Sequence, residues 1–276
     1  MSSTAAVSAP FASALNRRRT PSWIHTIAVL AVIAEPVRVG VDVAGRAAFY
    51  DHDDVYSSMM NGPTVLVFPL VAVLLSCLPL HEQLRARHVA NTRTRMPSRL
   101  LAGRHLRRVA IVAGGVFFLH AFVAFLVAHV VWPWFGDPAI DWAPTDMTPA
   151  EVVENRLTGT SYTFLYAHGT FVYGLAYAGW VGLAAAAYAT LGACILFLLP
   201  NRILALSIPF LVYATGTAAS ALIGAPRTGL MSSVFPYGLV AGHPLEAAAS
   251  TLIVILGTAA LAVLVIVRAP TNPRLS

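Results

Sequence analysis

Long apolar stretches, separated by polar, charged or proline-rich segments, dominate the pattern of this chain. A helix needs about 20 residues to cross a hydrocarbon core of roughly 30 Å, and six stretches meet or approach that length. All but the first lack Asp, Glu, Arg and Lys. The pattern therefore predicts an all-α, polytopic membrane protein with six transmembrane helices, at about 23–44, 64–80, 109–132, 171–199, 203–223 and 247–267.

The stretch 171–199 is long for a single crossing. A turn near Gly179–Gly182 would leave two pieces of about 14 residues, each too short to span, so we expect one tilted helix. Within it Gly174, Ala178 and Gly182 recur every four residues. Such a row of small residues suits close helix packing, either inside the protein or between two copies.

The first stretch, 23–44, differs from the others because it carries Glu35, Arg38 and Asp42. Glu35 and Arg38 are one helical turn apart and could pair. Ionisable residues at membrane depth often mark function, so these three are candidate intramembrane charged residues. The alternative is that they lie in the headgroup region near Pro36 and only satisfy one another.

The arginines that precede this stretch give the N-terminus a superficial likeness to a signal peptide. No small-residue cleavage site follows the apolar run, so we expect a retained first helix after a disordered cytoplasmic tail, 1–22.

The composition agrees with a membrane protein. Hydrophobic residues make up 57% of the chain and charged residues only 11%, too few to cover the surface of a soluble domain of this size. The net charge is +6 and all 18 basic residues are arginines. These arginines lie beside the apolar stretches, which indicates membrane orientation and a lipid bilayer as partner rather than nucleic acid.

The arginines also predict the orientation. Eight of them fall in the loop 81–108, and the two tails and the segment before 203 bring the number on that side of the membrane to 14. The positive-inside rule places this side in the cytoplasm, with both termini inside and a second cytoplasmic tail at 269–276. We expect a multi-pass protein of the plasma (inner) membrane, with a transmembrane domain over 23–268.

Two outer segments have recognisable local structure. The external segment 133–170 contains Thr148 followed by Glu151, the pattern of a helix-initiating capping box. The last outer loop, 224–246, is too apolar to be freely solvated, and we expect it to dip back into the outer leaflet, protected by surrounding protein.

Signatures of enzymes are absent from the sequence. It has no GxxxxGK[ST] phosphate loop, no GxSxG elbow and no Cys/His set with zinc-like spacing. We therefore assign no catalytic, cofactor-binding or metal-ligating residue. Energy for any uphill transport must come from an ion gradient or from a separate ATPase chain.

Taken together, these features resemble the permease subunits of type-2 ABC exporters. The likeness rests on six spans, an inside N-terminus, and a loop after the second span that opens with a glutamate and continues to an arginine-containing stretch. It also includes a proline-containing passage around the start of the fifth span. In this chain these passages are Leu80–Leu84, Asn91–Arg95, Leu199–Arg202 and Ile208–Phe210.

The resemblance implies a dimer with a second permease copy or a paralogue, and two ABC ATPase subunits on separate chains that bind the ATP. It also implies that the loop 81–108 contains a coupling helix docking on the ATPase. Its transmission surface would comprise Glu82, Arg85, Arg93 and Arg95. The first span departs from the uninterrupted apolar pattern of that family.

Two other functions stay open. A gradient-driven transporter or channel would use Glu35, Arg38 and Asp42 to carry the coupling ion. A membrane-embedded enzyme or an assembly scaffold would draw on His120, His129 and His168. His120 and His129 are half a turn apart around one helix, so we expect each to be buried and bonded to a neighbouring helix rather than to share a ligand.

Overall fold

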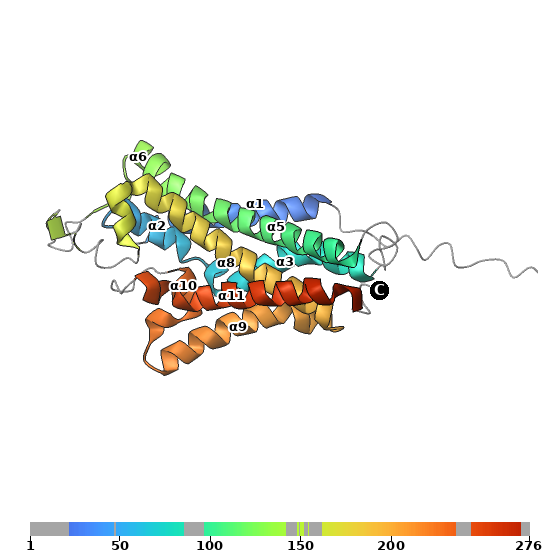
Figure 1. Cartoon of the computed structure of the whole chain (residues 1–276). Coiled ribbons are helices and arrows are strands. Elements are labelled where there is room, and N and C mark those ends of the chain that lie inside the picture. The colour runs from blue at the N-terminus through green and yellow to red at the C-terminus, as the bar shows by residue number, and fades with distance from the viewer. Residues whose placement is uncertain are drawn as a thin grey trace, which may run out of the picture.

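The computed structural model of this chain describes residues 22–46, 48–85, 97–141, 148, 150–151, 154, 162–235 and 244–271. The described residues form an elongated bundle of helices, joined by short helical turns (Figure 1). Among them the only β-type pairing is a single bridge between Phe49 and Ile140. The predicted all-α class is confirmed.

Five helices are long and apolar enough to cross a membrane, which supports a multi-pass membrane protein. The first predicted span also forms a helix, α1 (Ser22–Ala44), but α1 is not among these five. The five spans are Pro63–Leu80, Ser98–Trp134, Thr170–Leu198, Arg202–Leu222 and Pro244–Thr271.

Two helices continue well past the predicted limits of their spans. Helix α3 (Pro63–Arg85) runs five residues beyond 80, and α5 (Ser98–Leu126) begins eleven residues before 109. The apolar stretch of the third span starts at 109 because hydropathy drops at the arginines, but the helix itself begins at Ser98, since arginine is a good helix former and the backbone ladder continues into water. After α5 the chain continues through a π-helical turn, η2 (Val127–Val131), into α6 (Trp132–Trp134).

Helix α8 (Thr170–Leu198) forms one uninterrupted helix, as predicted, and lies at the centre of the bundle. It packs closely along α5 at glycines of the small-residue row. A Cβ on Gly182 would lie 2.8 Å from the carbonyl oxygen of Gly114, and one on Gly174 would collide with the ring of Phe125. The row therefore serves a helix interface inside the protein.

Helices α9 (Arg202–Leu222) and α11 (Pro244–Arg268, followed by η6, Ala269–Thr271) flank α8 and expose much of their apolar surface. Asn201 caps α9 by accepting hydrogen bonds from the backbone N–H groups of Ile203 and Leu204. Apolar side chains facing outward all along a helix are what a lipid environment requires.

The chain between α9 and α11 folds back into the bundle through η5 (Pro226–Thr228) and α10 (Leu230–Val234). Its backbone is bonded by side chains of neighbouring helices: Trp180 donates to the Ser233 carbonyl at 2.9 Å, and Thr217 accepts from the N–H of Met231 at 3.0 Å. Phe235 is buried, with its ring 5.2 Å from that of Phe68. The expected protection of this loop by surrounding protein is seen for 226–235; residues 236–243 lie outside the described residues.

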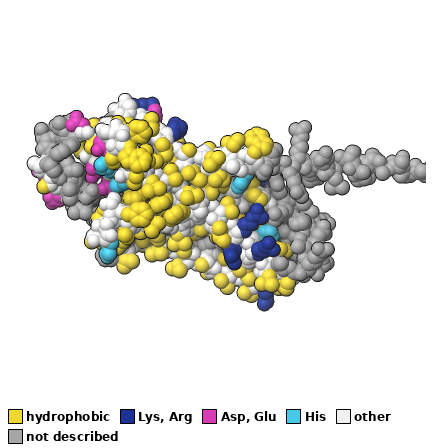
Figure 2. All heavy atoms as spheres, turned by 90° about the horizontal axis from the view of Figure 1, so that it is seen from above, with side chains coloured by type: hydrophobic (Ala, Val, Ile, Leu, Met, Phe, Trp, Pro, Cys, Tyr) yellow, Lys and Arg dark blue, Asp and Glu magenta, His cyan; other side chains and the backbone are white. Residues whose placement is uncertain are grey.

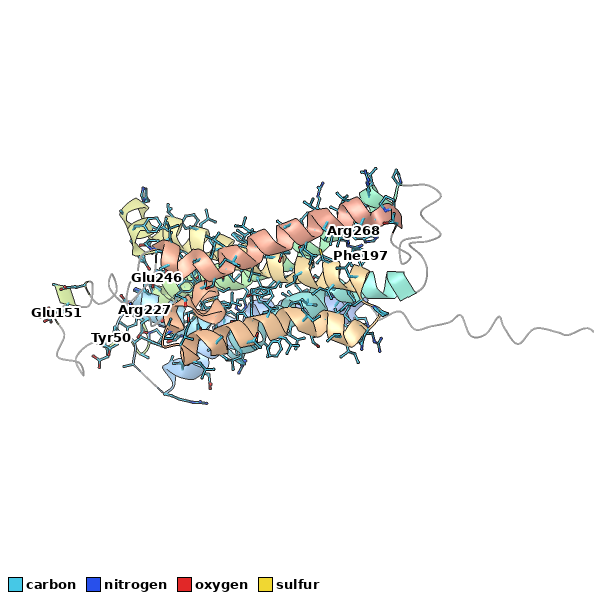
Figure 3. All side chains as sticks on the ribbon, turned by 60° about the horizontal axis from the view of Figure 1, so that its bottom comes forward. Tyr50, Glu151, Phe197, Arg227, Glu246 and Arg268 are labelled. Atoms are coloured by element: carbon cyan, nitrogen blue, oxygen red, sulfur yellow. The ribbon has the colours of Figure 1, made fainter. Side chains whose placement is uncertain are left out.

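The charges separate along the bundle. We call the end where α5 begins and α11 finishes the arginine end, and the opposite end, which holds α2 (His52–Met60) and η4 (Thr163–His168), the acidic end. Figure 2 shows arginines gathered toward one end and acidic side chains at the other. In Figure 3, Glu151 and Glu246 lie at the acidic end, with Arg227 beside them, and Arg268 lies at the arginine end.

Candidate functional site

The predicted coupling loop is a helical extension at the arginine end over its described part. The first turns of α5 bury Leu101 and Leu106, while all four arginines of this segment are exposed. One side of the extension is thus anchored to the bundle, and the other presents positive charge. The exposed arginines are Arg99, Arg104, Arg107 and Arg108.

The residues predicted for the transmission surface all precede this extension in the chain. Glu82 and Arg85 lie in the last turns of α3. Arg93 and Arg95 lie outside the described residues. The structure therefore assigns part of the predicted surface to the end of a spanning helix, directly before the segment that leads into α5.

The three charged residues of α1 do not meet at one point. Glu35 turns toward the start of α3, where its carboxylate accepts a hydrogen bond from the backbone N–H of Thr64 at 3.4 Å. Asp42 pairs instead with Arg46, at 2.9 Å, on an exposed part of the helix. Arg38 is exposed and attracts the Glu35 charge, but the structure shows no direct ion pair between them. The pairing considered for Glu35 and Arg38 is thus not seen.

His120 joins α5 to α1, as expected of a buried histidine bonded to a neighbouring helix. Its Nδ1 lies 2.7 Å from the carbonyl oxygen of Val32. Pro36, four residues after Val32, has no N–H to give this carbonyl, so the helix leaves the oxygen without its usual partner. Nδ1 must carry the proton, because a carbonyl only accepts. His120 therefore supplies the hydrogen bond that the Val32 carbonyl lacks because of Pro36.

A polar cluster at the acidic end joins three separate elements. On α2, the carboxylate of Asp53 is only 9% exposed. The hydroxyl of Tyr166, on η4, donates to its Oδ1 at 2.5 Å, and Nε2 of His129, in the π-helical turn η2, lies 3.1 Å from the same oxygen. His129 is thus also bonded to a neighbouring helix, as expected.

Aromatic rings enclose the histidine of this cluster. The ring of Phe125 stacks on His129 at a centroid distance of 4.4 Å, and Tyr56 meets it edge-on at 6.1 Å. Tyr173 of α8 in turn stacks on Tyr166 at 4.2 Å. π-Helical turns are rare and occur often at functional sites, and here η2 is the turn that carries His129.

Three further carboxylates lie at the edges of the cluster, those of Asp137, Asp54 and Asp51. Nε2 of His52 is 3.0 Å from Asp137, a more exposed pair than Asp53 and His129. Asp54 accepts from the backbone N–H of Tyr50, at 3.2 Å, and burial raises the pKa of its carboxyl. Asp51 caps α2 by accepting from the N–H of Asp54 at 2.9 Å.

The segment 133–170 confirms one local prediction. Thr148 and Glu151 form the capping box, in which the N–H of Thr148 donates to the Glu151 carboxylate at 2.6 Å and the Glu151 N–H donates to the Thr148 hydroxyl at 3.4 Å. The bond from Thr148 lowers the pKa of Glu151. Most of the short helix expected after Thr148 lies outside the described residues.

A small pocket of about 160 Å³ lies between η4 and α8 at the same end of the bundle. Tyr162 closes one side of it in a left-handed backbone conformation, at φ 67°, which is uncommon for a bulky residue. Burial raises the pKa of Tyr162 to about 12. The pocket is lined by Tyr162, Leu165, Ala176, Tyr177 and Trp180.

Sequence reasoning missed the meeting of Asp53, His129 and Tyr166. The run Asp51–Asp54, in which all four residues are ionisable, precedes the second apolar stretch and could have indicated a polar site. Within the described part of the chain, no group of three His, Cys, Asp or Glu side chains is arranged to hold a metal ion.

Comparisons of this chain with protein families, curated proteins and solved structures gave no match.

Proposed function

We propose that this chain is the permease subunit of an ATP-driven exporter, energised by a separate ATPase that docks on the loop 81–108. The observation that carries the proposal is the exposed arginine surface at the start of α5. This surface belongs to the same helix that packs along α8 through the core. A partner that moves the arginine end would therefore move the spanning helices with it.

The orientation follows from the separation of charge. With the arginine end in the cytoplasm, α1 begins and α11 finishes on the cytoplasmic side, and the acidic end faces outward. We propose that α1 is a sixth span, since its 23 residues amount to about 35 Å of helix. The Val32 carbonyl and the Glu35 carboxylate of α1 are both satisfied by neighbouring helices. We further propose that the protein lies in the plasma membrane and forms a dimer with a second permease chain.

The gradient-driven alternative needs Glu35, Arg38 and Asp42 to bind one coupling ion. These residues face three different surroundings: the start of α3, the exposed surface, and Arg46. No contact among the described residues favours a shared site for the three.

Co-purification tests the proposal. The tagged chain is isolated from cells that express it with the products of its neighbouring genes, and ATPase activity and subunit composition are measured. We expect a soluble subunit with a phosphate-loop motif to co-purify and to hydrolyse ATP. If no such subunit binds, and reconstituted chain alone transports in response to an ion gradient, the proposal is wrong.

Charge reversal locates the docking surface. We expect Arg104→Glu combined with Arg107→Glu to weaken ATPase binding about tenfold or more, as reversal of complementary interface charges does. Glu82→Arg and Arg93→Glu should uncouple transport in the same way. Arg227→Glu, at the acidic end, is the matched control and should leave binding unchanged. Equal loss in all these variants would contradict docking on 81–108.

A further inference from the structure

Three aromatic rings line the small pocket between η4 and α8. Tyr162 stands directly before η4, Tyr177 and Trp180 belong to α8, and Leu165 and Ala176 complete the lining; we call these five residues the aromatic pocket. The rings of Tyr162 and Trp180 have centroids 6.2 Å apart and planes inclined at 57°. A cation is attracted to an aromatic ring when it lies within about 6 Å of the centroid, so one cation in this pocket can interact with both rings.

The polar atoms of these rings are turned away from a ligand or already bonded. Nε1 of Trp180 donates to the carbonyl oxygen of Ser233 at 2.9 Å, and the hydroxyl of Tyr177 donates to the carbonyl oxygen of Val234 at 3.4 Å. The hydroxyl of Tyr162 is buried. A water molecule needs roughly two to four polar partners and finds none among the described residues of the lining. The pocket therefore suits a ligand whose outer surface is apolar.

Charge and size favour a cation with an apolar outer surface over a plain hydrocarbon. The segments 45–63, 133–170 and 224–246 connect helices at the acidic end and contain nine acidic residues and three arginines. The pocket lies at this end, where the excess of negative charge attracts cations. Its volume of about 160 Å³ is close to the roughly 150 Å³ of an apolar cavity that holds benzene, and a trimethylammonium group is of similar size to benzene.

We propose that the aromatic pocket binds a quaternary ammonium group of the choline type. Methyl groups surround the charged nitrogen of such a group, so it needs no hydrogen-bond partner and is recognised by the faces of aromatic rings. The group can belong to a phosphocholine lipid head or to a free quaternary ammonium compound, and the chemistry of recognition is the same for both. Binding is non-covalent.

The backbone around Tyr162 fixes its ring relative to the other two. The φ of 67° at Tyr162 is uncommon for a bulky residue, and backbone strain of this kind clusters at ligand-binding sites. The carbonyl oxygen of Tyr162 accepts a hydrogen bond from the N–H of Leu165 at 3.0 Å, at the start of η4. Further along η4, the ring of Tyr166 stacks on that of Tyr173, on α8, at 4.2 Å. Tyr162 is thus held against the helix that carries the other two rings.

The pocket is accessible from the level of the lipid headgroups. Helix α8 has 29 residues, about 44 Å, and therefore extends past a hydrocarbon core of roughly 30 Å. Ala176 is exposed and lies near the beginning of α8, which starts at Thr170. The pocket is thus close to the end of the span, where both a lipid head and a dissolved cation can reach it.

Calorimetric titration of the full chain in phosphatidylglycerol nanodiscs tests the aromatic pocket. The two probes are choline and its neutral isostere dimethylbutanol, in which a carbon atom replaces the nitrogen. We expect choline to bind at least about tenfold more tightly, because only the cation is attracted to the ring faces. Equal affinity for the two probes, or no binding of choline, would overturn the proposal.

Variants assign the binding to the rings. Tyr162→Leu removes one ring and should weaken choline binding about fivefold or more, whereas Tyr162→Phe keeps the ring and should bind as the wild type. Ala176→Leu, at an exposed position of α8, narrows the pocket and should weaken binding even if Tyr162→Leu does not fold. Tyr50→Leu is the matched control, since Tyr50 is an exposed tyrosine at the acidic end outside the pocket (Figure 3). Choline affinity unchanged in Ala176→Leu, or lowered equally by Tyr162→Leu and Tyr50→Leu, would count against the site.

The source of the ligand is identified by native mass spectrometry of protein released from nanodiscs of mixed phosphatidylcholine and phosphatidylglycerol. A lipid head in the pocket would leave phosphatidylcholine bound to the wild type and absent from Tyr162→Leu. Equal lipid retention by the two, together with choline binding in the titration, would identify a free quaternary ammonium compound. Both results agree with the proposed chemistry of the pocket.

These measurements use the chain without any ATPase partner. The aromatic pocket can therefore fail its test while the exporter proposal stands, and the reverse also holds.

Discussion

The hydroxyl of Tyr213, on α9, donates a hydrogen bond to the carbonyl oxygen of Val65, on α3, across 2.9 Å of the buried core. Val65 lies four residues before Pro69, which has no N–H to complete the helical ladder. The backbone of α3 leaves helical geometry between them, at Val67. Tyr213 therefore bonds the carbonyl that Pro69 leaves without its helical partner, as His120 does for the carbonyl that Pro36 leaves open. In lipid such a carbonyl has no water to bond, so a side chain of a neighbouring helix must supply the donor.

We predict that Tyr213→Phe lowers the free energy of unfolding by about 1–3 kcal/mol, because it leaves the Val65 carbonyl buried and without a partner. Tyr188→Phe is a matched control: this tyrosine is also fully buried, beside Tyr213, but among the described residues its hydroxyl has no hydrogen-bond partner. Reversible unfolding in mixed micelles measures both. Similar losses in the two variants would contradict the proposed role of the Tyr213 hydroxyl.

The bond between His120 and Val32 predicts a coupling with Pro36. His120→Phe should lower the free energy of unfolding by about 1–3 kcal/mol in the wild-type background. With Pro36→Ala, the new N–H can bond Val32, so the cost of His120→Phe should be smaller. A double-mutant cycle on the unfolding equilibrium measures the difference. Equal costs in the two backgrounds would show that His120 acts by packing alone.

The contact between α5 and α8 predicts opposite effects for two glycines of one helix. Gly182→Ala places a methyl group 2.8 Å from the Gly114 carbonyl oxygen and should destabilise the protein by about 1–3 kcal/mol. Gly179→Ala meets no atom within 4 Å and should be neutral or stabilising by up to about 1 kcal/mol, since alanine favours helix. Thermal unfolding of both variants measures the two changes in stability. A loss in Gly179→Ala as large as that in Gly182→Ala would refute the close approach.

Asp54 predicts a pH-dependent stability. Burial raises the pKa of its carboxyl in the folded protein, so the folded state holds this proton more tightly than the unfolded chain. The group therefore favours folding at pH below its unfolded value, and that contribution is lost as the pH rises through the folded pKa. We expect Asp54→Asn, which keeps an acceptor for the Tyr50 N–H, to raise the unfolding midpoint at pH 7 and to lose this advantage near pH 3. An advantage that is the same at both pH values would be inconsistent with charge burial.

Hydropathy was sufficient to place the five long apolar helices, because a helix of about 20 apolar residues meets both demands of lipid, an apolar surface and a bonded backbone. It thus placed the long helix over 171–199 within one residue at each end. Hydropathy marks only the apolar part of α5, which starts eleven residues after the first residue of the helix, Ser98. Transfer of a side chain to lipid depends on charge, but helix formation by arginine does not.

The sequence could not predict which side chains of different helices are hydrogen-bonded to one another. These helices are apolar on nearly every side, so no amphipathic stripe shows which face of one helix meets which face of another. Tyr213 and Val65 are 148 positions apart, and Tyr166 and Asp53 are 113 apart.

By itself, the sequence determined the all-α class, the places of five long apolar helices, the separation of charge between their ends, and the prolines that break hydrogen bonds in α1 and α3. The tertiary structure alone decided which donors repair those breaks and that Asp53, His129 and Tyr166 meet. The physical reason is that hydrophobicity and helix propensity act along the chain, whereas the rotation and contacts of each helix are set by packing against its neighbours.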